Sequence, residues 1–582
     1  MASSSSTDSV ALDSTQAVVD TRVVTRRVLL LAPALVLVAA SWRYAEVDPG
    51  KLFRPATLAS LWNFVIHLFP PDLSPTFLRT VLWAVIQTIA TAVASTVLSI
   101  ALAVPLSLLA TGTLWHRGVL VSAEVGSFTN NLGAISSRLV RALLGFMRAV
   151  PDLVWALLFV AAVGLGPLAG TLALTISYGG VLGRVYADVF EHVDPQPLEA
   201  LQGTGATRLQ IFLRGIWPQA LPHLMAYSLY SFECCLRAAA VLGFVGAGGI
   251  GYEISVSMKL IEYHQALTLL LSFILLLAAT DAISRLARKR WINNLDSRIQ
   301  TIARHRKAPG WMLLQGKFAR LVVVALFFWA CFVLAGFTSE AFAQAGLAGR
   351  LAVFVRHMLS PDLSWTFVRS LGRALLQTIA ISLMGTLMGL VLAVILALPA
   401  TSTLAFTPTD APGRVHISER FVRWLLFWSA RLVLNVLRSI PELVWVLVCI
   451  LGVGIGPFAG TIALGLHTAG VLGKLYAETM EEVPRRPLEA LRSLGARPLQ
   501  LLLWAIWPQA RPLLSSYTVL RWEMNLRAST ILGLVGGGGL GQAIYNNVQL
   551  GFYPRLTTLI LLVYALVLST DWIGERLRLR VA

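Results

Sequence analysis

Long apolar runs alternate with short polar segments along most of this chain of 582 residues. A membrane-spanning α-helix needs about 20 apolar residues, and most of the runs reach that length. The pattern therefore predicts twelve spans, six in each half of the chain, with the third interrupted by Pro151 and the short first run extending beyond its apolar part. The predicted spans are residues 28–42, 78–110, 139–163, 167–189, 221–244, 266–287, 321–337, 368–400, 422–453, 457–480, 513–534 and 557–572.

The chain repeats itself with a constant offset of 290 residues, because Pro151 matches Pro441 and Asp281 matches Asp571. A constant offset over so long a stretch indicates a tandem duplication in parallel order. We expect a cytoplasmic tail at 1–27, a first half at 28–290, a basic cytoplasmic linker at 291–317 and a second half at 318–582.

The composition excludes an ordinary soluble protein, since 56% of the residues are hydrophobic and only 13% are charged. The net charge of +18 does not indicate nucleic-acid binding, because Lys and Arg cluster between the apolar runs, as the positive-inside rule requires. Basic residues precede the first span, fill the linker and follow the last span. Both termini and the linker are therefore predicted on the cytoplasmic side, held near anionic lipid in the case of the linker.

The loop after the fourth span of each half is polar and occurs twice in nearly the same form. Residues 199–220 and 489–510 align without gaps and are identical at 13 of 22 positions. Each begins with an acid and an alanine near a helix start and is bent by a glycine six residues later. These residues are Glu199, Ala200 and Gly205, and Glu489, Ala490 and Gly495. The span count places both loops in the cytoplasm. They are interpreted as docking helices or, alternatively, as amphipathic helices that pack on their own bundle.

The two loops resemble the coupling helix of ABC-importer permeases, which is seated in a groove of an ATPase subunit. Both keep Glu, Ala, Gly and Pro at the family's spacing. They depart from the family pattern at the third position, where Leu201 and Leu491 replace an alanine. They also place Ile216 and Ile506 one residue later than the pattern does. The resemblance implies that both loops dock ATPase subunits.

Further segments are similar to the phosphonate-importer permease family, namely residues 148–155 and 164–170, their copies 290 residues later, and the Leu-Arg-Ala triplets at 236–238 and 526–528. The resemblance implies an all-α polytopic membrane protein of two tandem six-helix type I ABC-importer (MetI-like) permease halves, related by a pseudo-twofold axis. It also implies two ABC ATPase subunits, an extracytoplasmic substrate-binding protein, a prokaryotic plasma (inner) membrane, and phosphonates, phosphite or phosphate as cargo.

No nucleotide, metal or catalytic motif stands out in the chain. Residues 470–474 come closest to a phosphate loop, but Thr468 replaces the required first glycine and Leu475 the required Ser or Thr. The nine histidines are scattered, and the four cysteines lie in apolar runs without metal-ligand spacing. We expect no enzyme activity and no cofactor or metal in this chain, with ATP and Mg bound by the ATPase subunits.

Charges inside the spans are candidates for the substrate path. Glu233 and Arg237 lie four residues apart on one predicted helix, and Glu523 and Arg527 repeat them. Charges at membrane depth are costly and face a partner or water. Either each pair neutralises itself along its own helix, or the two arginines face the path and hold an anion.

A glycine tract follows each charged span on the predicted outer side. Gly248 and Gly249, with Gly538 and Gly539, could form a gate or offer backbone N–H groups to an oxyanion. Close packing in an outer turn is the alternative, and we favour it.

Two other function classes compete with an ABC importer. A secondary transporter driven by an ion gradient typically shows inverted repeats, whereas this repeat is parallel. A membrane enzyme acting on lipid would need an acid–base or metal constellation.

Overall fold

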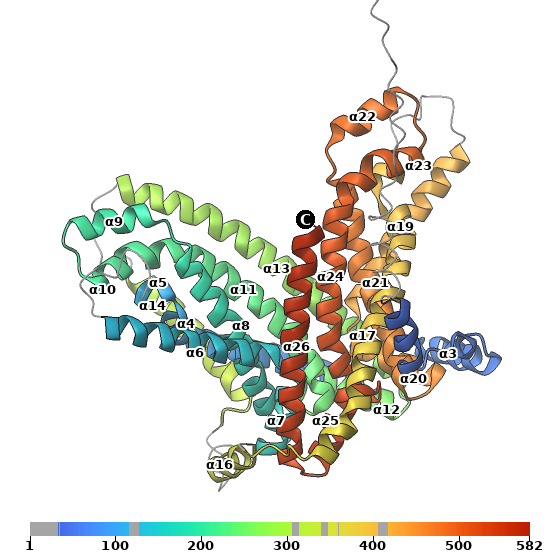
Figure 1. The fold of residues 1–582 in the computed structure, drawn as a ribbon, viewed down its shortest axis with the longest axis horizontal. Helices are drawn as coiled ribbons and strands as arrows, with labels where there is room; N and C mark the ends of the chain where they lie inside the picture. The colour runs from blue at the N-terminus through green and yellow to red at the C-terminus, as the bar shows by residue number, and fades with distance from the viewer. Residues whose placement is uncertain are drawn as a thin grey trace, which may run out of the picture.

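The computed structural model describes residues 33, 35–115, 127–304, 314–338, 347–358, 360–405 and 417–581, and every regular element in these ranges is a helix (Figure 1). The first half holds the helix Leu35–Tyr44, α2 (Pro49–Leu52), α3 (Pro55–Leu68), α4 (Pro75–Ala110), α5 (Gly112–Trp115), α6 (Ser127–Ala149), α7 (Asp152–Val163), α8 (Pro167–Glu191), α9 (Pro195–Gly203), α10 (Arg208–Ile211), α11 (Trp217–Leu242), α12 (Gly249–Lys259) and α13 (Tyr263–Arg304). The second half holds α14 (Leu314–Leu334), α16 (Leu347–Met358), α17 (Trp365–Ala400), α18 (Ser402–Ala405), α19 (Ile417–Ser439), α20 (Glu442–Val453), α21 (Pro457–Glu481), α22 (Arg485–Ser493), α23 (Pro498–Leu501), α24 (Trp507–Leu532), α25 (Gly539–Gln549) and α26 (Tyr553–Val581). Short π and 3₁₀ turns join α10 to α11, α11 to α12, and their counterparts.

Each predicted span overlaps one or two of these helices. By length and composition, seven of the described helices could cross a membrane, or nine if each of two bent pairs is one span. Two further helices, Leu35–Tyr44 and Val322–Leu334, are apolar but shorter in their described parts. The remaining predicted span falls on α24, whose charged residues include Arg521, Glu523 and Arg527. The all-α polytopic fold is confirmed.

The third span of each half is broken more sharply than the interruption at Pro151 suggested. The chain turns by 88° between α6 and α7 and by 98° between α19 and α20. Pro151 has extended backbone angles, and proline cannot continue the helical hydrogen bonding. The Trp155 indole N–H donates to the Met147 carbonyl at 3.2 Å, so a carbonyl freed by the break is satisfied. With 12 residues, α7 is about 18 Å long and too short to cross a bilayer alone.

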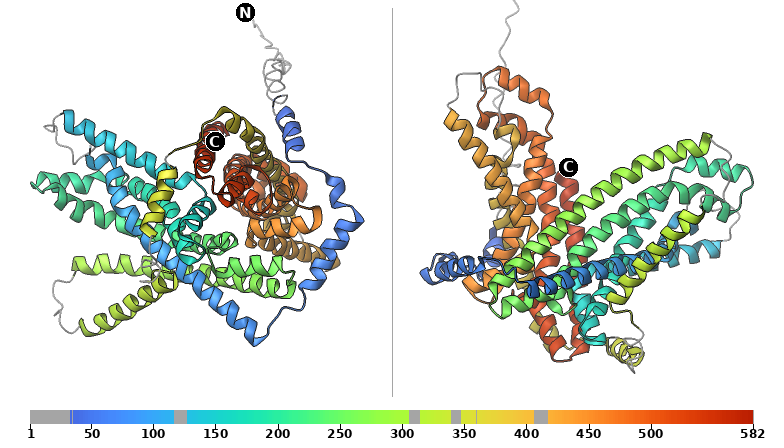
Figure 2. Two further views of the ribbon diagram at one scale, coloured as in Figure 1. Left: turned by 90° about the horizontal axis from the view of Figure 1, so that it is seen from below. Right: turned by 180° about the vertical axis from the view of Figure 1, so that it is seen from behind.

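Each half contributes its first apolar helix to the other half's bundle. Val322–Leu334, within α14, packs on α4, where Cys331 contacts the cluster of Ala90 and Val93. The chain after Leu35–Tyr44 packs on α17 through Ala45, Ala380 and Met384. In Figures 1 and 2, α14 accordingly lies along the first-half arm, and the N-terminal helix lies beside the second-half arm. Neighbours in sequence are thus not neighbours in the bundle.

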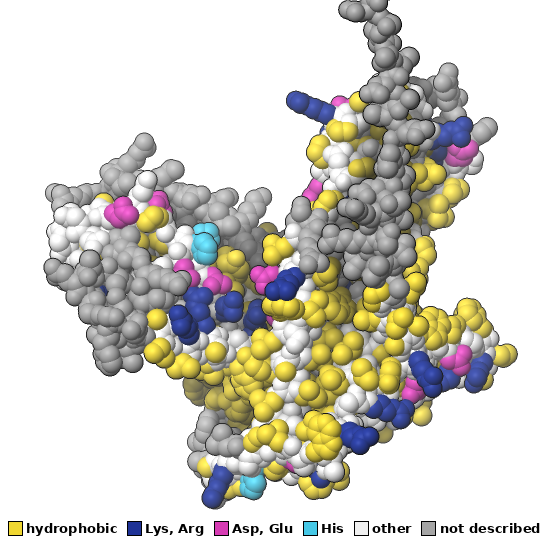
Figure 3. Space-filling model, in the orientation of Figure 1, with side chains coloured by type: hydrophobic (Ala, Val, Ile, Leu, Met, Phe, Trp, Pro, Cys, Tyr) yellow, Lys and Arg dark blue, Asp and Glu magenta, His cyan; other side chains and the backbone are white. Residues whose placement is uncertain are grey.

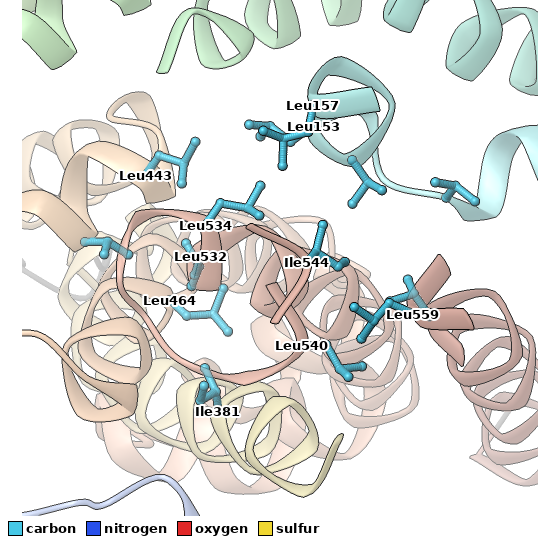
Figure 4. Close-up of a cluster of buried hydrophobic side chains, with 14 of the residues drawn as sticks. Leu153, Leu157, Ile381, Leu443, Leu464, Leu532, Leu534, Leu540, Ile544 and Leu559 are labelled. Atoms are coloured by element: carbon cyan, nitrogen blue, oxygen red, sulfur yellow. The ribbon is translucent and has the colours of Figure 1, made fainter. Parts of the chain in front are cut away.

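The helices form two arms that diverge from a common base (Figures 1 and 2). Buried apolar side chains from both halves meet at this base, among them Leu153 and Leu157 from α7, Leu443 from α20 and Leu534 (Figure 4). We call this inter-half cluster the leucine seam. Lipid tails are as apolar as leucine, so in a membrane such contacts gain from close packing rather than from exclusion of water.

The surface agrees with a protein that lies in a bilayer. In Figure 3, hydrophobic side chains form a broad band across the visible face. Charged side chains gather around α3 and α16, at the tip of the second-half arm, and along the first-half arm toward the angle between the two arms. A broad apolar surface of this kind is the distribution that a bilayer favours.

Candidate functional site

The two docking helices predicted from the sequence, α9 and α22, lie at the free tips of the two arms (Figure 1). They begin at Pro195 and Arg485, four residues before Glu199 and Glu489. The Asp194 carboxylate accepts from the Gln196 N–H at 3.1 Å and caps α9. The bend after each helix rests on glycine, since Gly205 and Gly495 have φ of +76° and +78°. An added Cβ would meet nothing within 4 Å there, so these two positions need glycine for conformation rather than for space.

One face of each docking helix packs inward and the other is free. Leu198 and Leu488 are buried, whereas Glu199, Ala200 and their counterparts are exposed. Among the described residues, neither Glu199 nor Glu489 has a hydrogen bond or ion pair. A carboxylate in this position is free to meet another subunit.

Leu201, one of the departures from the family pattern, serves the inward face. An added Cβ on Gly215 would lie 2.5 Å from Leu198 and 3.2 Å from Leu201, so these leucines fill the space beneath the helix. Large apolar side chains stay exposed around the same loops, including Leu494 (82%) and Trp504 (75%). Exposed apolar side chains beside free carboxylates are typical of a protein–protein docking surface.

An ion pair that sequence reasoning missed fixes the end of the helix before each docking helix. Arg141 on α6 donates to Glu191, the last residue of α8, at 2.5 Å, and Arg431 donates to Glu481 at 2.7 Å. The same carboxylates accept from backbone N–H groups just after α4 and α17, at 2.7 and 2.5 Å. We call this arrangement the arm clamp. The available signal was an acid in the last turn of a predicted helix, where the helix dipole disfavours it unless a cation is near.

The intramembrane arginines pair with the last helix of their own half rather than along their own helix. Arg237 donates to Asp281 on α13 at 3.1 Å, and Arg527 donates to Asp571 on α26 at 2.7 Å. Glu523 accepts from Arg578, also on α26. Glu233 is buried. The repeat had aligned Asp281 with Asp571, but only packing reveals them as the partners of the arginines.

The glycine tracts are close-packed turns. Gly248, Gly249, Gly538 and Gly539 have φ between +73° and +79°. A Cβ on Gly249 would lie 2.5 Å from the Thr88 Oγ1, and one on Gly539 would lie 2.6 Å from the Thr378 Oγ1. The Gly249 N–H donates to Gln87 at 2.7 Å. These contacts favour the packing interpretation over an oxyanion contact, and a gating role for the tracts stays a prediction.

A cavity of about 830 Å³ lies beside the leucine seam and is lined by both halves. The first half contributes Tyr252 and Lys259, and the second contributes Gln542, Tyr545 and Gln549. The glycine tracts reach it through Gly246 and Gly536. One lysine among tyrosines and amides offers hydrogen-bond donors that suit an anion.

Comparison with known proteins supports the interpretation of the repeat as a tandem duplication. The family described as "Binding-protein-dependent transport system inner membrane component" matches residues 118–293 and again 417–582. The chain is 31% identical over 446 residues to the phosphate-import permease protein PhnE of Mycolicibacterium smegmatis, covering 75% of this chain and 77% of that protein. It is 34% identical over 269 residues to the phosphite transport system permease protein PtxC of Stutzerimonas stutzeri, covering 46% of this chain and 90% of that protein. Among solved structures, an inward-facing MetNI methionine ABC transporter covers 38% of this chain and 100% of its own at 24% identity, with a TM-score of 0.33.

Proposed function

This chain belongs to the family of binding-protein-dependent transport system inner membrane components, and we propose that it supplies the entire transmembrane pathway of an ATP-driven importer for phosphorus oxyanions. It is a multi-pass membrane permease, and the family region occurs twice in one chain. Two permease halves in one polypeptide would then do the work of two subunits. Both termini would lie in the cytoplasm of a prokaryotic cell, beneath its plasma membrane.

The observation that carries the proposal is the pair of equivalent docking helices at the two arm tips, each with one exposed glutamate (Figure 1). Two docking helices would seat two ABC ATPase subunits, which would bind ATP and Mg. A substrate-binding protein would deliver cargo from the other side of the membrane. Glu199 and Glu489 would orient the docking helices, and Gly205 with Gly495 would shape them.

Movement would follow from the geometry of the arms. When ATP brings the two ATPase subunits together, the docking helices approach each other and draw the arms with them. The arm clamp would transmit this displacement, because it ties the ends of α4 and α8 to Arg141 of α6 directly before α9. Closing the arms at their tips would open the leucine seam on the opposite side, and ATP hydrolysis would reverse the change.

Phosphate, phosphite and related phosphonates are the proposed cargo. Relatives whose names specify phosphate and phosphite are 31% and 34% identical to this chain. Arg237 and Arg527 would contribute positive charge along the path, although each is already paired with an aspartate. A path lined with paired cations would bind an anion weakly enough to release it.

Uptake by the reconstituted complex tests this function. The chain would be purified with its ATPase subunits, placed in proteoliposomes and supplied with the binding protein, and uptake of radioactive phosphate would be followed with ATP inside. We expect ATP-dependent uptake that falls to background in the double variant E199A/E489A, while the variant stays folded. Uptake that follows an ion gradient without ATP would instead establish a secondary transporter. Normal uptake by the double variant would contradict the docking role.

A further inference from the structure

Three ionisable side chains converge in the second half where the first half has a different set. They are Glu442 at the start of α20, His467 on α21 and Arg521 on α24. Their counterparts 290 residues earlier are Asp152, Ser177 and Ser231. The first half therefore keeps the acid but replaces both possible cations by serines, so the two halves have diverged here.

The pair of His467 and Glu442 is defined by two contacts. The His467 Nδ1 lies 3.1 Å from the Ile440 carbonyl, which can only accept, so Nδ1 carries a proton. The His467 Nε2 faces the Glu442 Oε2 at 3.8 Å. The imidazole is thus held by the backbone at the α19–α20 bend and is directed at the carboxylate.

Arg521 is the unusual member of the group. It is half-buried, its Nε is buried without a hydrogen-bond partner, and among the described residues it makes no hydrogen bond and no ion pair within 4.0 Å. The helix that carries it, α24, packs against both α20 and α21, which carry Glu442 and His467. By contrast, Arg141 and Arg527 each donate to a carboxylate. A partly buried guanidinium with unfilled donors is costly unless an anion or water satisfies it.

The group lies where the two halves meet. Glu442 directly precedes Leu443 of the leucine seam, and Asp152 directly precedes Leu153 on the other side of the same seam (Figure 4). Leu153 and Leu443 belong to one buried cluster, which places the two bends on either side of the same seam. An anion beside Arg521 would therefore lie at the edge of the inter-half path.

We propose that Arg521, beside His467, forms a binding site for a tetrahedral phosphorus oxyanion that exists in the second half alone. This inference rests on the proposed function and adds where, and on which half, the cargo is held. A planar guanidinium can donate two parallel hydrogen bonds to such an anion. Glu442 competes with the anion for Arg521, so binding is weak and release is easy. One site on one half holds a single anion in each cycle.

Phosphorus NMR titration tests the site directly. The full chain with its ATPase subunits is placed in nanodiscs of phosphatidylcholine and titrated with inorganic phosphate and, separately, with phosphite. We expect saturable binding whose dissociation constant rises at least about tenfold in R521M, because a charge-assisted contact is lost. The dissociation constant should rise less in R521K, because lysine keeps the charge but loses the planar geometry. The matched control R511Q changes an exposed arginine on the same helix and should bind as the wild type does.

A gain of affinity separates a binding site from a merely structural role. E442Q removes the competing carboxylate and should lower the dissociation constant severalfold, a result that misfolding cannot produce. Equal binding by the wild type, R521M and E442Q would overturn the site and leave Arg521 as a structural residue. Saturation by free phosphate in zwitterionic lipid would exclude a lipid headgroup as the required ligand. If the wild type showed no ATP-dependent uptake in proteoliposomes, the proposed function itself would be wrong. Normal uptake by R521M with an unchanged KM would contradict this site alone and leave the proposed function standing.

Discussion

Arg148 in the first half reaches Asp571 in the second half, with 3.6 Å between the guanidinium and the carboxylate. Asp571 also accepts from Arg527 of its own half at 2.7 Å. The counterpart of Arg148 behaves differently, because Arg438 donates to Asn435, one turn before it on α19, at 3.1 Å. Within the described residues, this ionic contact thus links the halves on one side of the pseudo-twofold axis and has no equivalent on the other.

This asymmetry predicts unequal effects of two equivalent substitutions. R148A should lower the free energy of unfolding by about 1–2 kcal/mol more than R438A, since only R148A removes a charged contact between halves. Thermal unfolding of the purified chain in detergent would measure the difference. Equal losses for the two variants would mean that the inter-half contact contributes nothing.

The arm clamp should matter for both stability and transport. R141A leaves the Glu191 carboxylate at the negative end of α8 without its cation, and we expect a loss of about 1–3 kcal/mol together with reduced uptake. The pair R141E/E191R should recover part of the uptake. K474A breaks an exposed pair on one helix face and should change stability by less than about 0.5 kcal/mol. A clamp variant with wild-type uptake would show that the ion pair does not transmit motion.

Docking of the ATPase subunits should depend on the exposed apolar side chains. W504A and L494A remove side chains that touch little of the chain itself, so we expect unchanged thermal stability. Their affinity for the ATPase subunits should fall by about 1–3 kcal/mol each, as for an aromatic or apolar anchor. Surface plasmon resonance with captured permease would give the constants. Unchanged affinity in both variants would place the docking surface elsewhere.

Two glycines that share a positive φ should respond differently to alanine. G249A adds a Cβ 2.5 Å from the Thr88 Oγ1 as well as the strain of a positive φ, and should cost about 2–4 kcal/mol. G205A meets open space, so only the strain of about 1 kcal/mol remains. The yield of folded chain and its midpoint of thermal unfolding would rank the two. A larger loss for G205A would contradict the packing at Gly249.

Asp72 and Asp362 predict an acid-dependent contribution to stability. Donation by Ser74 lowers the pKa of Asp72, and donation by Ser364, assisted by Arg555, lowers the pKa of Asp362. Because the folded pKa lies below the unfolded one, the stabilisation is fully present above the unfolded value near 3.8 and is lost as the pH falls through the folded value. Between about pH 5 and 8 both carboxylates are ionised in the folded and in the unfolded chain. The free energy of unfolding should therefore not change with pH through these two groups in that range. The variant D72N/D362N, compared with the wild type in unfolding curves below about pH 4, should lose less stability on acidification; identical slopes would refute the assignment.

Much of the architecture could be read from local properties of the sequence. Apolar run lengths predicted the helices, and the offset of 290 residues predicted two equivalent halves. The spacing of Glu199, Gly205 and their copies predicted the short helices that the structure has as α9 and α22. These features depend on residues close together in the chain, where helix periodicity, proline and glycine act directly.

What only the tertiary structure decided is which distant groups meet. Packing between helices far apart in sequence decides the exchange of first helices between the halves and the aspartate partners of Arg237 and Arg527. It also leaves Arg521 without an ion pair among the residues that the structure describes. Hydropathy cannot supply this information in a membrane protein, because side chains that face lipid and side chains that face another helix are equally apolar. The partners of the buried charges are fixed only once the bundle has packed around them.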